Sequence, residues 1–160
     1  MSPILKNRTI SINTKTRVLK CYVWSVLLYG SECWTINKEM GKRLEATEMW
    51  FLRKILNAPW TVGASNESIL NRMKWKRCLL NTIRYRQLKF LGHIIRKGCL
   101  EHLVLSGKIN GKKDKGRPRI KYLENVNLGI EKQCHEKIDF LHAAQDRKNW
   151  RIMLANVCNR

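Results

Sequence analysis

The chain has 160 residues, enough for one domain with a buried core or for two small helical units. Its hydrophobic content of 44% is too high for an intrinsically disordered protein. With 32 Lys and Arg against 12 Asp and Glu, the formal net charge is +20, which favours a polyanionic partner because a compact domain with that charge repels itself.

The N-terminal part of the chain has the apolar periodicity of helices. A first helix is expected from a cap at Asn13 or Thr14 to about Tyr29, and its apolar character on all sides indicates burial against other helices. The residues expected on its inner face are Val18, Cys21, Tyr22, Ser25, Val26 and Tyr29, widened by Leu19, Val23 and Leu27.

Two further helices are expected before residue 75. The first covers about 38–57 with Asn37 as its cap, and Pro59 follows its end. Its predicted inner stripe is Met40, Leu44, Phe51, Leu52, Ile55 and Leu56. The second is short, with Ser65 as a good N-cap and Glu67 favourable in its first turn.

A long amphipathic helix is predicted over about 75–97. Its apolar face is expected to contain Leu80, Ile83, Gln87, Phe90 or Leu91, and Ile94. Its outer face is expected to carry the basic residues Lys76, Arg77, Arg84, Arg86, Lys89 and Arg96.

The C-terminal part is predicted to contain a short helix near 99–106, a loop over 107–119, a helix over 121–131 and a last helix over about 140–156. Asp139 is the expected cap of the last helix, whose apolar face holds Leu141, Ala144, Trp150, Met153 and Leu154. The chain is therefore predicted to be all-α. Tyr29, Trp34, Trp50 and Leu52 are expected in an N-terminal core, and Leu91, Ile94 and Trp150 in a separate one.

The positive charge is concentrated in one part of the sequence. Residues 72–121 hold sixteen basic and two acidic side chains, a net +14 of the total +20. A block of this kind is typical of a nucleic-acid-binding surface, and an anionic membrane or an acidic protein is a weaker interpretation.

The strongest local concentration is the segment GKKDKGRPRIK, residues 111–121. Its basic residues are Lys112, Lys113, Lys115, Arg117, Arg119 and Lys121. Pro118 fixes an extended backbone and Gly116 permits a close approach, so the flanking Arg side chains can point along a narrow groove. The Gly-Arg-Pro core is also the one used by AT-hook segments in the DNA minor groove. Contact with a groove or phosphates and a merely solvated linker both remain open.

Catalysis by the chain alone is not expected. Polymerase and nuclease chemistry with two metal ions needs clustered carboxylates. The three Asp, at 114, 139 and 146, have no acidic neighbour, and the nine Glu are scattered. No Tyr-x-Asp-Asp-like motif, phosphate-binding Gly loop or Ser/His/Asp arrangement is present.

No metal or other cofactor is predicted. Cys99-x-x-His102 has the spacing of zinc ligands, and Cys134-His135 follows about thirty residues later. However, an adjacent Cys and His cannot easily reach one tetrahedral ion together. Ordinary buried Cys and His residues explain the pattern more simply.

The sequence also shows no signal for secretion or for a membrane span. No apolar run reaches the roughly 18 residues needed to cross a bilayer, and the N-terminus does not have the layout of a signal peptide. Six Cys at irregular spacings are most simply reduced thiols in the cytosol or nucleus.

Seven sequence blocks, in order, carry a family resemblance. The first two are Ile10-Ser11-x-x-Thr14-Lys15-x-Arg17-x-Leu19-Lys20 and Leu27-Leu28-Tyr29-Gly30-Ser31-Glu32-Cys33-Trp34-Thr35. The next are Arg43-Leu44-Glu45-Ala46-x-Glu48-Met49-Trp50-x-x-Arg53-Lys54-Ile55-Leu56, Trp60-Thr61 with Asn66-Glu67, and Ile83-Arg84-x-Arg86-x-Leu88-x-Phe90-Leu91-Gly92-His93-Ile94-Ile95-Arg96. The last are Gly107-Lys108-Ile109-x-Gly111 with Gly116-Arg117-Pro118-Arg119, and Ala144-x-Asp146-Arg147-x-x-Trp150-Arg151.

In this order the blocks resemble the C-terminal part of the endonuclease/reverse-transcriptase polyprotein of non-LTR (LINE-type) retrotransposons, over about residues 6–155. The resemblance implies a helical thumb over 6–60 that rests on the primer–template duplex. A basic nucleic-acid-binding extension over 64–160 follows, with a flexible loop at 107–119. The palm carboxylates and the endonuclease lie upstream in such polyproteins, so a palm domain is a further expected partner.

The chain departs from the family pattern after the Gly-Arg-Pro-Arg loop. Tyr122 stands where Trp is expected, and the acidic pair that is common there is reduced to Glu124. Three functions remain open at this point: a non-catalytic nucleic-acid-binding module, a decayed reading frame with no function of its own, and a subunit that works only when docked on a palm domain. RNA or DNA preference and oligomeric state are not determined by the sequence.

Overall fold

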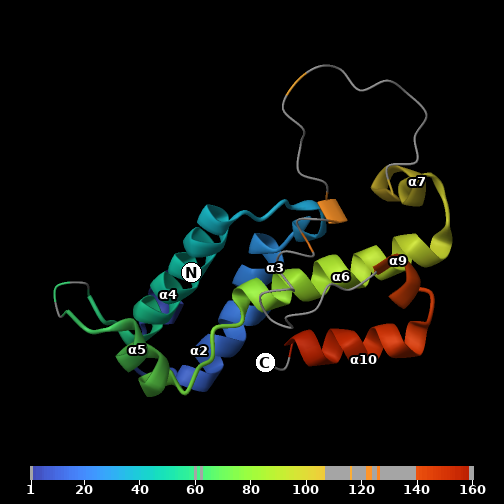
Figure 1. The fold of residues 1–160 in the computed structure, drawn as a ribbon. Coiled ribbons are helices and arrows are strands. Elements are labelled where there is room, and N and C mark those ends of the chain that lie inside the picture. Colours follow the sequence, from blue (N-terminus) through green and yellow to red (C-terminus); the bar gives the residue numbers. More distant parts are fainter. Residues whose placement is uncertain are drawn as a thin grey trace. The chain divides into compact units, whose positions relative to one another are not determined.

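The computed structural model of the chain describes residues 2–59, 61, 63–106, 116, 122–123, 126 and 140–158. Over these residues the structure contains helices and turns and no strand, so the all-α prediction is confirmed (Figure 1). The elements are α1 (Ser2–Lys6), α2 (Ile12–Val18), the π-helical turn η1 (Leu19–Val23), α3 (Trp24–Leu27), the 3-10 turn η2 (Ser31–Cys33), α4 (Lys38–Leu56), α5 (Asn66–Met73), α6 (Leu79–Lys97), α7 (Leu100–Ser106), α9 (Phe140–Ala143) and α10 (Arg147–Cys158).

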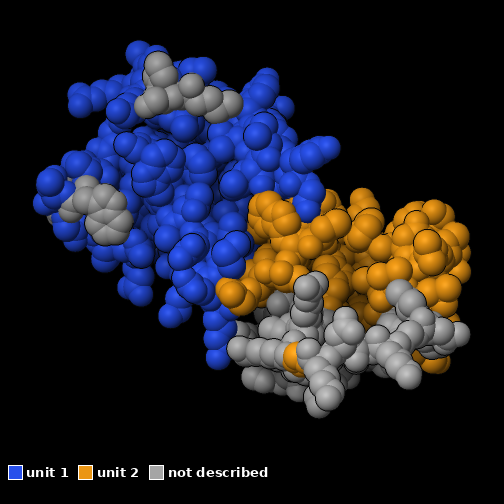
Figure 2. Space-filling model, turned by 90° about the horizontal axis from the view of Figure 1, so that it is seen from above, with its two compact units in different colours: residues 1–30, 38–80 blue, residues 31–37, 81–160 orange. Residues whose placement is uncertain are grey.

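The chain forms two compact units, which Figure 2 shows in blue and orange. Unit 1 consists of Met1–Gly30 and Lys38–Leu80, and unit 2 consists of Ser31–Asn37 and Asn81–Arg160. Unit 1 thus holds α1 to α5 apart from η2, and unit 2 takes in the short segment 31–37 together with most of α6. A thumb over 6–60 and an extension over 64–160 remain the division that the family resemblance implies.

In unit 1 the first long helix has a different inner face from the one expected. Ser11 caps it, accepting the backbone N–H of Thr14 at 3.2 Å. The predicted inner residues Tyr22, Val26 and Tyr29 are 62%, 78% and 86% exposed, so that prediction is wrong. Leu19, expected at the edge of the inner face, is buried as predicted, and the other buried residues are Lys15, Trp24 and Leu28.

The π-helical turn η1 explains this difference. The buried series is spaced by four residues from Lys15 to Leu19, by five to Trp24 and by four to Leu28. A π-helical turn adds about one residue to a turn, so every later side chain rotates relative to a uniform α-helix. A constant period of 3.6 residues therefore assigned the wrong face beyond Leu19.

Helix α4 is the centre of unit 1 and packs against α1, α2 and α5. Of its predicted stripe, Leu52 and Ile55 are buried, whereas Met40 is exposed. Its C-terminal end is closed by the left-handed Asn57 and by the Ala58 N–H, which donates to the Arg53 carbonyl at 3.0 Å. Helix α5 starts as predicted, because the Ser65 hydroxyl accepts the N–H of Ser68 at 3.2 Å.

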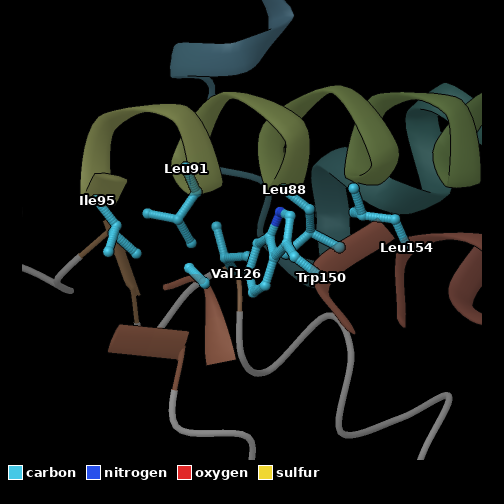
Figure 3. Packing of buried hydrophobic residues seen from close by; sticks show 7 residues of the cluster. Leu88, Leu91, Ile95, Val126, Trp150 and Leu154 are labelled. Carbon is cyan, nitrogen blue, oxygen red and sulfur yellow. The ribbon is translucent and has the colours of Figure 1, made fainter. Parts of the chain in front are cut away.

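The core of unit 2 lies between α6 and α10. Its buried residues are Leu88, Leu91, Ile95, Val126, Ala144, Trp150 and Leu154. Figure 3 shows the Trp150 indole against α6, close to Leu88, Leu91 and Val126. The apolar face predicted for α6 is confirmed at Ile83, Gln87, Leu91 and Ile94, all of which are buried.

A glycine on α6 allows this packing. A Cβ built at Gly92 would lie 2.8 Å from Cδ1 of Trp150, closer than real Cβ atoms come to another side chain. The Phe90-Leu91-Gly92-His93 block and the Trp150 block thus meet in one contact.

The last predicted helix is broken into α9 and α10. Asp146, rather than Asp139, is the residue that caps α10: its Oδ1 accepts the N–H of Lys148 at 2.8 Å, and its Oδ2 accepts from Asn149 Nδ2 at 2.8 Å. Asp139 and most of the helix predicted over 121–131 lie outside the described residues.

The two predicted cores are only partly right. Leu52 is buried in unit 1, and Leu91 and Trp150 are buried together in unit 2. Tyr29 is exposed and Trp50 is 50% exposed, so neither belongs to a core. Trp34 is half-buried and lies in unit 2, not in unit 1.

Candidate nucleic-acid interface

The basic residues predicted for the long helix divide between the two units. Lys76 and Arg77 precede α6, which begins four residues later than expected, and both are exposed in unit 1. Arg77 forms an ion pair with Glu45 at 3.2 Å. Such a half-exposed pair contributes little to stability, and it leaves the guanidinium near solvent.

Arg84 does not lie on the outer face of α6, and the prediction that it does is wrong. Its side chain is 6% exposed. Nη1 donates to Gln87 Oε1 at 3.0 Å and Nη2 to the Ile36 carbonyl at 3.4 Å. Burial lowers the pKa of Arg84 from its ordinary value. Arg84 therefore holds unit 2 together rather than meeting an external phosphate.

The other α6 cations are nearer to solvent. Lys89 is exposed, and Arg86 is half-buried with Nη1 4.0 Å from Glu32 Oε1. Arg96 is exposed, although its Nη1 donates to the Ala144 carbonyl at 2.8 Å. Lys97 follows and forms an exposed pair with Glu101 at 3.6 Å. Three of the predicted basic residues of α6 can therefore contact a phosphate at the surface of unit 2: Arg86, Lys89 and Arg96.

The six basic residues of the predicted loop, Lys112, Lys113, Lys115, Arg117, Arg119 and Lys121, lie outside the described residues. Within that segment the structure describes Gly116, which is exposed. Cys134 and His135, weighed above as metal ligands, lie outside the described part as well, whereas Cys99 and His102 are at the start of α7. Over the described ranges, no group of three His, Cys, Asp or Glu could hold a metal ion.

The block Ser31-Glu32-Cys33-Trp34 is held by side chains of unit 2. Gln87 Nε2 donates to the carbonyls of Trp34 at 2.7 Å and Ser31 at 3.3 Å. The Tyr122 hydroxyl donates to the Glu32 carbonyl at 2.7 Å, and burial raises the pKa of Tyr122 to about 12. This sequence block therefore has a structural role, because buried carbonyl groups need donors.

A buried carboxylate performs a similar role in unit 1. Glu48, 1% exposed, accepts Trp75 Nε1 at 2.9 Å, the Cys78 N–H at 3.0 Å and the Leu79 N–H at 3.2 Å. The last two are the N–H groups at the start of α6, which have no acceptor within the helix. Glu48 thus fixes where α6 begins, a role that could not be predicted from local sequence because the capping side chain comes from another helix.

Cys78 is held in its thiol form by the same environment. Burial, and next the charge of Glu48, raise its pKa to about 12. At pH 8 its thiolate fraction should then be about a hundredfold or more below that of an ordinary exposed Cys. Iodoacetamide should modify the exposed Cys21 and Cys99 first and leave Cys78 intact, as measured by mass spectrometry of peptides.

The pH dependence has a defined sign. The unfolded chain loses the Cys78 proton near pH 9, whereas the folded chain keeps it to about pH 12. This thiol therefore supports the fold below pH 9 and progressively less as the pH rises above it. Equal alkylation rates for Cys78 and Cys99 in the folded protein would contradict the burial of this thiol.

One basic cavity was not anticipated from the sequence. It lies in unit 1, has a volume of about 450 Å³ and is lined by Lys6, Trp50, Arg53, Lys54, Asn57, Ala58 and Pro59. Lys54 Nζ lies 5.3 Å from the centre of the Trp50 ring. The Arg53–Lys54 pair could have drawn attention to it, but the contribution of α1 depends on the tertiary fold.

No helix of the described part is long and apolar enough to cross a bilayer. No family model matches the chain, and no solved structure matches it. The chain is similar to an uncharacterized transposon-derived protein of Caenorhabditis elegans, with 28% identity over 159 residues, covering 91% of this chain and 56% of that protein. It therefore spans about half the length of the curated relative that it matches, and the similarity supports a transposon-related origin.

Proposed function

We propose that the chain is a non-catalytic, nucleic-acid-binding fragment of a non-LTR retrotransposon reverse transcriptase. The observation that carries the proposal is the net charge of +14 over residues 72–121. Lys89, Arg86 and Arg96 of this block lie at or near the surface of unit 2. The sequence blocks, in their order along the chain, and the similarity to a transposon-derived protein support the retroelement origin.

The proposed mode of binding is phosphate neutralisation on a DNA or RNA–DNA duplex. Basic side chains of this kind fix position and orientation, and they carry no sequence information by themselves. The described carboxylates include Glu45, Glu48 and Asp146, and each of these is engaged by protein donors. Over the described residues, no group of three His, Cys, Asp or Glu could hold a metal ion, and we assign nucleotide incorporation and strand cleavage to the palm and endonuclease parts of the parent polyprotein.

The test is the salt dependence of duplex binding, measured by fluorescence anisotropy between 50 and 200 mM salt. Each phosphate contact adds about 0.9 to the slope of log affinity against log salt on duplex DNA. Replacing Arg117 and Arg119 by Ala should lower the slope by about two, and Lys89→Gln by about one. Lys38→Gln with Lys42→Gln, on the more balanced helix α4, is the matched control and should change it less.

Two results would contradict parts of this proposal. An unchanged slope in the Arg117/Arg119 variant would make residues 111–121 a solvated linker. An unchanged slope in the Lys89 variant would exclude α6 from the interface. Better binding to A·T-rich duplex, lost in the Arg117/Arg119 variant, would indicate that the Gly-Arg-Pro segment enters the minor groove.

A second proposed function, a positioning subunit for a reverse-transcriptase palm domain, is favoured by one observation. Tyr22 on η1, Val26 on α3 and Tyr29 in the turn after α3 place exposed apolar side chains on unit 1. Surfaces of this kind often mark protein contacts. Val26→Asp should then abolish co-purification with the palm domain of such a polyprotein and leave the salt slope on free duplex unchanged.

A further inference from the structure

The basic cavity of unit 1 has the parts of a nucleotide site. We infer that it binds one unpaired nucleotide of a single strand, with the base against Trp50 and the adjoining phosphate on Lys6 and Lys54. The inference extends the proposed nucleic-acid binding, because it assigns a second site that reads the base face and lies outside the 72–121 block. Its experiment uses single strands, so that its failure can be told from failure of duplex binding.

Trp50 provides the stacking surface. It lies on α4, is 50% exposed and lines the cavity. Phe51 packs edge-on against it with ring centres 5.0 Å apart, which restricts the orientation of the indole. Base stacking on an exposed aromatic ring tolerates any sequence, because every base has a π-face.

The charge at the cavity is positive. Lys6 and Lys54 both line it. Lys54 Nζ lies over the Trp50 ring, so a base that stacks there displaces this ammonium group toward the adjoining phosphate. Two carbonyls at the C-terminal end of α4 are already paired with protein donors. Those of Arg53 and Lys54 accept the N–H groups of Ala58 and Asn57, at 3.0 and 3.3 Å.

The walls of the cavity are fixed by hydrogen bonds. Arg53 Nη2 donates to the Ala64 carbonyl at 2.7 Å and to Asn66 Oδ1 at 3.0 Å, so it acts as a positioning residue. Asn57 Nδ2 donates to the Lys6 carbonyl at 3.0 Å, which ties the end of α1 to the end of α4. A volume of about 450 Å³ lies within the usual range of small-ligand pockets, roughly 300–1,000 Å³.

The experiment compares two labelled single strands of equal length and charge with the full chain. One is a twelve-nucleotide oligothymidylate, and the other has the same phosphates with abasic sugars. The chain should prefer oligothymidylate, and Trp50→Ala should lower its affinity for that strand about tenfold or more and remove the preference. Trp50→Phe should keep most of the preference, since it retains an aromatic face.

Matched variants distinguish binding at the cavity from non-specific attraction to the positive charge of the chain. Lys54→Gln should weaken oligothymidylate binding more than Lys42→Gln, which removes the same charge from an exposed position on the same helix. Tyr22→Ala removes another exposed aromatic residue of unit 1 and should have no effect on the preference. Circular dichroism and the duplex salt slope should be unchanged in Trp50→Ala.

The outcomes are distinct. Equal affinity of the original chain for the two strands, or an unchanged preference in Trp50→Ala, would overturn the inference while leaving duplex binding intact. Loss of duplex binding with a preserved Trp50-dependent preference would overturn the proposed duplex interface and support the cavity.

Discussion

Replacing Trp150 by Ala is expected to lower the free energy of unfolding by about 3–5 kcal/mol, the usual cost of removing a large aromatic side chain from a core. Trp150 is 2% exposed and lies in the unit 2 core with Leu88, Leu91 and Leu154. Only partial collapse of the cavity is expected, because its walls come from α6 and α10. Urea unfolding followed by far-UV circular dichroism measures the change.

The close packing of Gly92 against Trp150 can be tested with a second substitution. Gly92→Ala should also destabilise the protein, by about 1–3 kcal/mol, because the added methyl group meets the Trp150 ring. Once Trp150 is Ala, the same change should cost much less, so the two effects should not be additive. Ile152→Ala, at an exposed position of α10, is the control and should stay within about 0.5 kcal/mol. Additive effects of the Gly92 and Trp150 changes would contradict the packing.

Regular amphipathic periodicity was the part of the fold that the sequence predicted best. Helix α6 keeps a period of 3.6 residues, and its inner residues Ile83, Gln87, Leu91 and Ile94 are buried as expected. Local capping was equally clear at Ser65, whose side chain bonds three residues ahead. Both features depend on neighbours within one helix.

Features that depend on another element were not predictable in this way. The π-helical turn η1 moves Tyr22 and Val26 to the surface, and nothing in the local composition indicated it. Arg84 and Lys89 were both expected on the outer face of α6 from their spacing along the helix. Arg84 is buried nevertheless, and its guanidinium donates hydrogen bonds to Gln87 and to the Ile36 carbonyl. At the basic cavity of unit 1, the end of α4 is joined to the end of α1 by the hydrogen bond from Asn57 to the Lys6 carbonyl, between residues 51 positions apart.

Contacts with other elements also explain several polar residues in the sequence blocks. Glu48, Arg53 and Asp146 are polar residues that the sequence blocks specify, and each bonds to backbone groups of its own unit. Gln87, at an unspecified position of its block, does the same. Their polarity therefore reflects the need to satisfy buried backbone groups and helix ends. Among the described residues, the cations at or near the surface and Trp50 are the candidates for ligand contacts.

Replacing Glu48 by Ala is the second change with a large expected effect, about 3–5 kcal/mol of lost stability. The variant would leave Trp75 Nε1 and the N–H groups of Cys78 and Leu79 without their acceptor. A buried donor left unsatisfied costs about 1–3 kcal/mol. The Leu79 N–H is buried, whereas Trp75 Nε1 and the Cys78 N–H are partly buried and should each cost less. The Trp75 indole would also lose its hydrogen bond to the carboxylate. Its T-shaped packing with Trp24, with ring centres 6.1 Å apart, would remain.

Glu48→Gln separates the hydrogen bonds from the charge. The amide keeps one oxygen acceptor at nearly the same position, so this variant should lose about 1–2 kcal/mol, less than Ala. Glu39→Ala is the matched control on α4, because Glu39 forms an exposed pair with Arg43, and it should change stability by no more than about 0.5 kcal/mol. Hydrogen exchange should locate the Glu48→Ala effect at the first turn of α6. Equal losses for Glu39→Ala and Glu48→Ala would mean that the carboxylate does not support the start of that helix.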